Sequence, residues 1–213
     1  MAMKKLLCLA ALLVAATGMK AQEQAAHQWW VKPMVGGTYS RPAGSGMDNL
    51  EYKLGLTAGA EVIYQPPRQE VFSVSGGLLY SQQGYKVNTS SNMTMSLNYL
   101  NIPLLMNFRL SDGLTLKIGL QPACLLASNA SFKLMGQEMS LDMSDGHETW
   151  NLTAPVGLAF NTGAGVVLDF RYYIGLSNIE SSEMTLAGQT IQNEGSRGRH
   201  SVFMLTLGYQ FNL

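Results

Sequence analysis

Two polar stretches of the chain hold side chains of the types that perform acyl transfer. His147 lies between Asp145 and Glu148, and His200 is followed directly by Ser201. A histidine oriented by a carboxylate and placed beside a serine hydroxyl suits nucleophilic acyl chemistry. No spacing motif joins these residues, and long polar segments carry such side chains by default. We therefore expect no catalytic residue here.

The acidic stretch is also a candidate cation site. Its donors are Asp142, Asp145, His147 and Glu148. Carboxylates can hold a divalent cation, but acidic segments of this kind are usually only solvated. Beyond the N-terminal stretch, Cys124 is the one remaining cysteine, so neither a disulfide within the mature chain nor a cysteine metal site can form. We expect no metal and no cofactor.

Eight stretches alternate apolar and polar residues, as β-strands with one apolar face do. The clearest is the last, where Phe203, Leu205, Leu207, Tyr209 and Phe211 alternate with Thr206, Gly208 and Gln210. The predicted strands span residues 29–39, 54–64, 72–83, 99–110, 114–126, 150–160, 166–176 and 202–213. Their lengths suit the roughly 9–11 residues that a tilted strand needs to cross a bilayer.

The connections between these strands alternate in length. Short ones follow Gln65, Ser111 and Asn161, and long polar ones cover residues 41–49, 84–98, 128–149 and 177–200. The third long connection holds a second alternating piece, residues 132–141, which predicts a hairpin standing above the strands. Short turns on one rim and long loops on the other are typical of outer-membrane barrels, with the short rim in the periplasm. With an even strand count both termini lie on that short rim.

Composition agrees with a membrane barrel. Charged residues make up 13% of the chain, there are 22 glycines, and the formal net charge is zero, which gives no basis for nucleic-acid binding. Lys4 and Lys5 precede the apolar run 6–16, which is typical of a secretory signal. We expect residues 1–21 to be a signal peptide and residues 22–213 an all-β, eight-stranded, antiparallel up-and-down transmembrane barrel.

Five charged side chains interrupt the less apolar faces of the predicted strands. They are Glu61, Arg109, Lys117, Asp169 and Arg171. A lysine or arginine that faced lipid at mid-depth would cost about 2–4 kcal/mol, so these residues must face the lumen. An eight-stranded barrel is filled by side chains, and unpaired buried charge is costly, so we expect both carboxylates to pair with Lys117 and Arg171 in a closed polar plug.

Four segments resemble the outer-membrane β-barrel family of Bacteroidetes that is often called PorT-like. They are YLNIPLLMNF at 99–108, GLQPACLL at 119–126, DFRYYIGLSN at 169–178 and LGYQF at 207–211. The resemblance covers essentially all of the mature chain. It implies a small barrel in the outer membrane, and one member of the family is linked to the type IX secretion system.

Three classes of function remain open. The first is a structural or surface-interaction barrel that contacts outer-membrane lipid, lipopolysaccharide or proteins through its long loops. The second is an accessory component of a type IX-like secretion machinery. The third is a lipid A acyl hydrolase or transferase at the extracellular rim, which would use His147 and His200. Arg197 and Arg199 are candidates to touch lipopolysaccharide phosphates. The first class, without enzyme activity, is our expectation.

Overall fold

The computed structural model describes residues 28–43, 50–87, 93–134, 137–142, 149–178, 183–186, 189–192 and 199–213. The predicted signal peptide and the acidic stretch 143–148 lie outside these residues. Within them, no helix is long and apolar enough to cross a membrane.

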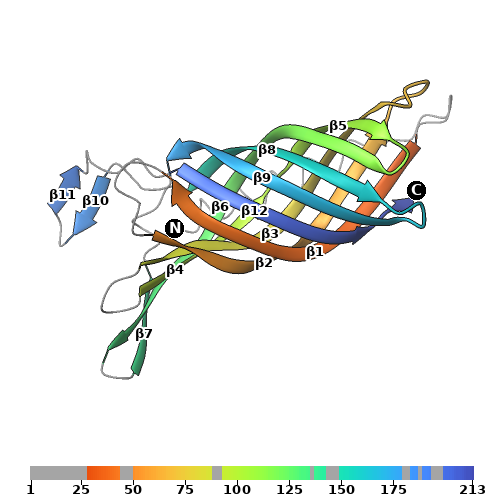
Figure 1. Cartoon of the computed structure of the whole chain (residues 1–213). Coiled ribbons are helices and arrows are strands. Elements are labelled where there is room, and N and C mark those ends of the chain that lie inside the picture. The colour runs from red at the N-terminus through yellow and green to blue at the C-terminus, as the bar shows by residue number, and fades with distance from the viewer. Residues whose placement is uncertain are drawn as a thin grey trace.

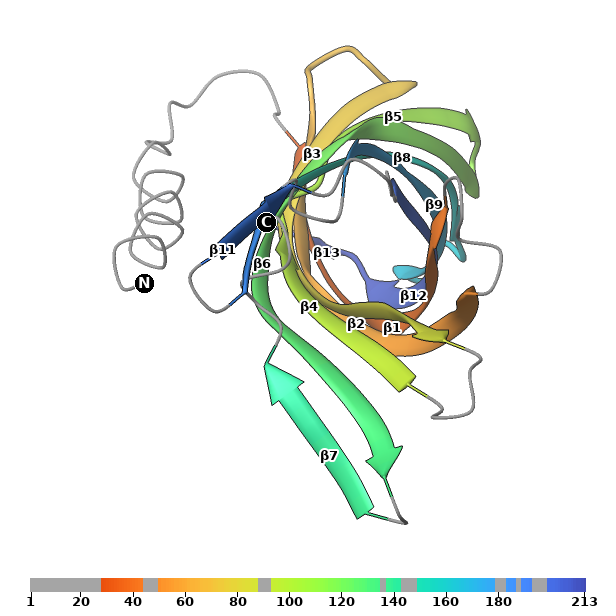
Figure 2. The same ribbon diagram turned by 90° about the vertical axis from the view of Figure 1, so that its left-hand side faces the viewer.

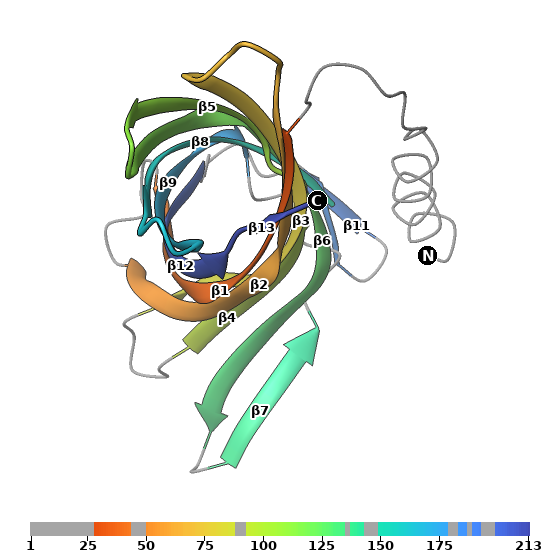
Figure 3. The ribbon, with the colours of Figure 1, turned by 90° about the vertical axis from the view of Figure 1, so that its right-hand side faces the viewer.

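Eight antiparallel strands close into a ring, as the alternating pattern predicts (Figure 1). In order around the ring they are β1 (Gln28–Ala43), β2 (Leu50–Gln65), β3 (Phe72–Val87), β4 (Met93–Asn101) with β5 (Leu104–Ser111), β6 (Leu114–Leu134), β8 (Trp150–Asn161), β9 (Val166–Asn178), and β12 (Arg199–Tyr209) with β13 (Phe211–Asn212). The ring is closed by β1 and β12, which pair from Met34–Gly208 to Ala43–Arg199. Both views along the barrel show this closed ring (Figures 2 and 3).

One crossing strand is made of two pieces. β4 ends at Asn101 and β5 begins at Leu104, because Pro103 between them has no N–H group for the ladder. The neighbouring strands bridge the break: the Ile102 N–H donates to the Pro122 carbonyl at 2.9 Å, and the Gly77 N–H donates to the Pro103 carbonyl at 3.2 Å. The wall is therefore continuous despite the proline.

The strands reach further toward the long loops than predicted. Residues 84–98, expected to be a loop, belong largely to β3 and β4, whose pairing continues from Leu79–Asn101 to Val87–Met93. β6 is the longest strand at 21 residues, and its end pairs with β7 (Gln137–Asp142). This hairpin, which the sequence predicts, leaves the ring and projects away from it (Figures 1 and 2). A separate hairpin, β10 (Glu183–Leu186) with β11 (Gln189–Gln192), forms within the predicted loop 177–200.

The two faces of the wall differ in the sense expected for a barrel in lipid. Leu54 and Leu56 point outward and keep 76% and 66% of their surface exposed, whereas Thr57 and Glu61 on the same strand are buried. Large apolar side chains are likewise exposed on β5, β8, β9 and β12. The charged side chains of the crossing strands thus face the lumen, and most large apolar side chains face outward, which is the reverse of a water-soluble barrel.

Aromatic side chains mark both ends of the apolar wall. Trp29 contacts Tyr64 with ring centroids 4.6 Å apart, and ten residues further along β1 Tyr39 stacks on Tyr52 at 4.3 Å. Ten residues at a rise of about 3.3 Å and a tilt of about 45° span about 23 Å along the barrel axis. This height matches the apolar band of about 25 Å that aromatic belts flank in such barrels. Tyr99, by contrast, lies inside the lumen at 1% exposure.

The seam between β1 and β12 provides a test of ring closure. A Cβ atom on Gly36, which faces the lumen, would lie 2.0 Å from the carbonyl oxygen of Leu205 on β12. At Gly37, on the outer face, the nearest atom is 3.6 Å away. We expect Gly36→Val to lower the free energy of unfolding by about 1–3 kcal/mol or more through overpacking, and Gly37→Val to leave it nearly unchanged.

Urea unfolding in lipid vesicles, followed by heat-modifiable gel migration, measures both variants. Equal losses at the two positions would contradict this account of the seam.

Candidate functional site

A cluster of five charged side chains lies inside the barrel. It consists of Lys32 on β1, Glu61 on β2, Lys117 on β6, and Asp169 and Arg171 on β9, and we call it the charge cluster. The Lys32 ammonium lies 3.0 Å from Glu61 Oε2 and 2.8 Å from Asp169 Oδ2. Lys117 bridges the same two oxygens at 3.1 and 2.9 Å. Strands from different parts of the ring are therefore joined across the lumen.

Arg171 completes the charge cluster. Its Nε donates to Asp169 Oδ1 at 2.8 Å and its Nη2 to Asp169 Oδ2 at 2.5 Å, while Nη1 lies 2.5 Å from Glu61 Oε1. None of the five side chains is more than 4% exposed. Three cations thus surround two carboxylates, and each carboxylate contacts all three cations.

The structure brings together four of the five residues named from the sequence. Glu61, Lys117, Asp169 and Arg171 meet in the charge cluster, whereas Arg109 lies apart from it along the lumenal recess. Arg109 is two residues from the end of β5, where the lumen opens to solvent, and its side chain is exposed.

Lys32 belongs to the charge cluster although it was not among the lumenal charges predicted from the sequence. The side chain is 1% exposed and contacts both carboxylates. A signal was present: Lys32 alternates with Val31 and Pro33 and shares a face with Met34 and Thr38, so its parity along β1 directs it to the lumen. It was overlooked because Pro33 makes this strand the least regular of the eight.

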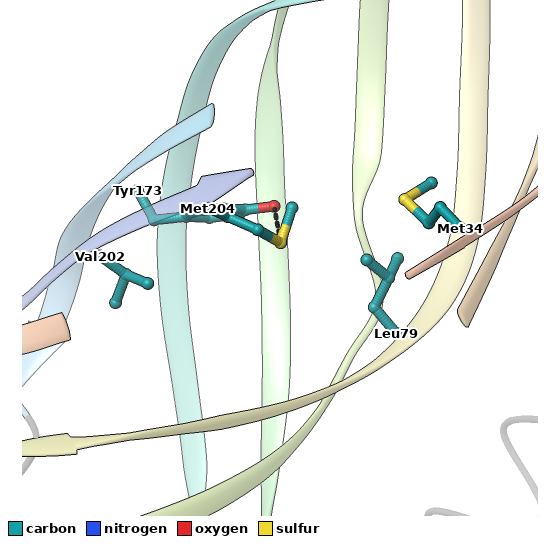
Figure 4. Close-up of a cluster of buried hydrophobic side chains, with 5 residues drawn as sticks. All are labelled: Met34, Leu79, Tyr173, Val202 and Met204. Atoms are coloured by element: carbon teal, nitrogen blue, oxygen red, sulfur yellow. Dashed lines mark hydrogen bonds between the residues drawn. The ribbon is translucent and has the colours of Figure 1, made fainter. Parts of the chain in front are cut away.

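Beyond the charge cluster, toward the long loops, the lumen is filled by apolar side chains. Met34, Leu79, Tyr173, Val202 and Met204 form this apolar layer, and each is at most 5% exposed (Figure 4). The Tyr173 hydroxyl donates to the sulfur of Met204 at 3.6 Å. In β1 and β9 the layer follows the charge cluster by one inward position, so the two lie in direct succession along the lumen.

A network of amides and hydroxyls adjoins the apolar layer. The Asn101 amide donates to the Leu79 carbonyl at 3.0 Å and to the Ser81 hydroxyl at 2.8 Å. Gln121 donates to the Asn101 side-chain oxygen at 3.1 Å, and Gln83 to Ser81 at 2.9 Å. Two cavities of about 10 Å³ remain, each close to the space of a single water.

On the opposite side, toward the short turns, the lumen contains a recess of about 80 Å³. Lys32 and Lys117 line it from within, and Glu70, Arg109 and Asp112 line it nearer the rim. Water can therefore approach the charge cluster from the short-turn side, where the recess has room for a few molecules.

Most of the other candidate residues lie outside the part of the chain that the structure describes. Asp145, His147 and Glu148 lie outside the described residues, as does the side chain of His200. Among the residues that can be placed, no three His, Cys, Asp or Glu side chains gather as a metal site would require. Cys124 is buried on β6 and takes part in no disulfide, and it lies in register with Leu100 and Trp150.

The chain matches a family model. The model described as outer membrane protein beta-barrel domain matches residues 20–181. A search of the curated proteins finds no match.

Several solved structures are similar to the chain. The attachment invasion locus protein Ail of Yersinia pestis is 19% identical, with 85% of this chain and 98% of that chain covered and a TM-score of 0.46. Neisserial surface protein A is 14% identical, with coverage of 87% and 99% and a TM-score of 0.49. Outer membrane protein W of E. coli is 16% identical, with coverage of 89% and 100% and a TM-score of 0.45.

Removing one carboxylate should destabilise the barrel strongly. We expect Asp169→Asn to lower the free energy of unfolding by about 3–5 kcal/mol, because it leaves buried cations without compensation. Arg109→Gln, at the exposed position, should change it by no more than about 0.5 kcal/mol. Adding Lys117→Met to Asp169→Asn restores the original charge balance and should recover part of the loss. Urea midpoints in vesicles measure all three, and equal effects of Asp169→Asn and Arg109→Gln would refute a central role for the cluster.

Proposed function

Because the chain belongs to the outer membrane protein beta-barrel domain family, we propose that it is a non-conducting barrel that acts through its long-loop end. The observation that carries this proposal is the filled lumen. The charge cluster and the apolar layer occupy successive levels of the interior, and the cavities beyond them are about 10 Å³ each. A barrel whose interior is filled by side chains can contact other molecules only through its outer wall and its loops.

The charge cluster supports a structural role for the lumen. Each of the two carboxylates is already in contact with three cations, and the guanidinium of Arg171 is engaged by both. A catalytic acid or base needs access to a substrate proton. A ligand-binding group needs hydrogen-bonding or ion-pairing capacity that other protein groups do not already use. The buried charges therefore serve to join strands, and the barrel is proposed to have no enzyme activity.

The hairpin of β6 and β7 is the best candidate for a contact surface. β7 pairs with β6 from Asn129–Asp142 to Leu134–Gln137 and, in the described part of the chain, with no other strand. Its second edge thus offers free backbone N–H and C=O groups, to which an extended segment of another protein can add as a further strand. We propose that protein partners are contacted here.

We propose the orientation that the sequence predicts, with the short turns and both ends of the barrel in the periplasm. The first and last strands meet at the short rim, where the Leu213 N–H donates to the Trp29 carbonyl at 2.9 Å. Export through a signal peptide of residues 1–21 belongs to the same proposal. Outer-membrane lipid and lipopolysaccharide then surround the apolar wall, and the projecting hairpin lies outside the cell.

Membership of the PorT-like branch and an accessory role in type IX-like secretion stay predictions from the sequence resemblance. The same holds for lipid A acyl chemistry, since His147 lies outside the described residues. No contact or cavity in the described residues favours either role over the surface-interaction barrel.

Conductance tests the closed lumen. In planar bilayers the purified chain should produce no steady channel, because ions would have to cross both the charge cluster and the apolar layer. Replacing Tyr173 and Met204 together by alanine should raise the leak, since it empties part of that layer without altering the outer wall. A large, steady open state of the unmodified chain would rule out the closed lumen.

Epitope insertion tests the orientation. A tag placed between Leu134 and Gln137, at the tip of the β6–β7 hairpin, should be accessible to antibody on intact cells. The same tag between Asp112 and Gly113, in a short turn, should be labelled only after the outer membrane is permeabilised. The reverse labelling would show that the long-loop end does not face outward.

A further inference from the structure

An arginine of the outer wall, Arg41, lies just beyond one aromatic belt. Arg41 on β1 is two residues past Tyr39 and shares its outward face. Its guanidinium carbon lies 4.9 Å from the centre of the Tyr52 ring on β2, in a cation–π contact. The side chain is thus held flat against the barrel, at the level where the apolar wall ends.

The rings beneath Arg41 form a continuous surface over four strands. Tyr39 stacks on Tyr52 at 4.3 Å, Tyr52 lies 6.4 Å from Phe203, and Phe203 lies 4.7 Å from Tyr172. We call these four residues the aromatic platform. It belongs to the belt about 23 Å from Trp29, and two further residues of β1 raise Arg41 about 5 Å above it. That height is the level of lipid headgroups rather than of hydrocarbon.

The polar groups beside Arg41 are those of an anion site. The Nε atom of Arg41 is buried and has no hydrogen-bond partner among the residues that the structure describes. Ser201 on β12 lies directly opposite Arg41 in the register, and its hydroxyl is 3.1 Å from the Tyr172 hydroxyl. The guanidinium thus lies on a surface of rings, and the strand position opposite Arg41 carries a serine hydroxyl that contacts a tyrosine hydroxyl.

We propose that Arg41, Ser201 and the aromatic platform hold a phosphate of the lipid anchor of lipopolysaccharide. The proposal rests on the orientation proposed above, which places this belt in the outer leaflet. A guanidinium binds phosphate oxygens with two parallel N–H donors, and whichever hydroxyl accepts in the Tyr172–Ser201 hydrogen bond can donate to a third oxygen. The acyl chains of the same lipid then lie along the exposed leucines below the platform, including Leu54, Leu56 and Leu205.

Arg199 extends the site toward the headgroup sugars. It pairs with Ala43, two residues beyond Arg41 on the same seam, and its side chain is exposed. Arg199 was named from the sequence as a candidate for phosphate contact, and Arg197 lies outside the described residues. Arg41 was not named, because only the fold places it over Tyr52.

A titration in detergent micelles tests the proposal. The mature chain is mixed with purified lipopolysaccharide, with its phosphorylated lipid anchor, or with the dephosphorylated anchor, and the midpoint of thermal unfolding is read from heat-modifiable gel migration. Both phosphorylated lipids should raise the midpoint. Arg41→Gln should need about tenfold more lipid for half of the effect, as expected for loss of a charge-assisted contact.

Arg109→Gln is the matched control, since it removes the same charge from the opposite rim. It should respond to lipid like the unmodified chain. Arg41→Lys keeps the charge but not the planar fork and should fall between Arg41→Gln and the unmodified chain. If Arg41→Gln does not fold, Tyr52→Leu, which removes the ring that supports the guanidinium, should show the same weakened response.

Three outcomes would overturn the inference. They are an unchanged response of Arg41→Gln, an equal response to the dephosphorylated anchor, and an equal shift with inorganic phosphate alone. The lumen and the hairpin are measured separately by conductance and by epitope labelling. Suppose that lipid does not raise the unfolding midpoint, while the barrel does not conduct and the hairpin tag is labelled on intact cells. That result would refute this inference and leave the proposed function intact.

Discussion

The contact of two carboxylates with three cations in the lumen is the constraint around which the barrel is arranged. Charge at membrane depth cannot face lipid, so it must be turned inward and neutralised there. Glu61 and Asp169 meet this requirement through partners on β1, β6 and β9, and the cluster links parts of the wall that share no backbone hydrogen bonds. The side chains that satisfy the charges also occupy the lumen at this level.

The architecture was largely predictable from the sequence because a barrel in lipid has a strict period of two. Leu54 and Leu56 outside, with Thr57 and Glu61 inside, follow directly from the alternation. The strand ends were not predictable in the same way. Beyond the apolar band both faces of a strand meet polar surroundings, so apolar and polar residues need not alternate there. The continuation of β3 and β4 into residues 84–98 is therefore hard to recognise in the sequence.

The sequence predicts that carboxylates pair with cations in the lumen, but it does not predict every residue of the charge cluster. Parity alone assigns Arg109 and Lys117 to the same face, yet only Lys117 is at the depth of the carboxylates. Depth depends on strand tilt and stagger, which relate residues of different strands and cannot be read from one strand's sequence. Lys32 and Arg41 depend on the same information, since each acquires its partner from a neighbouring strand.

The pairing of β1 with β12 also bears on how the molecule assembles. Contacts across this seam, such as that between Thr206 and Met34, join residues 172 positions apart. We expect these contacts to form last, after the other strands of the ring have paired. The loss of chain entropy on closing the longest loop then accompanies the pairing of β1 with β12. Until then both seam strands expose unpaired backbone, which is untenable in hydrocarbon. The unpaired backbone groups of the unclosed chain must therefore be kept out of the hydrocarbon. We expect insertion into the membrane and closure of the seam to occur as one concerted event.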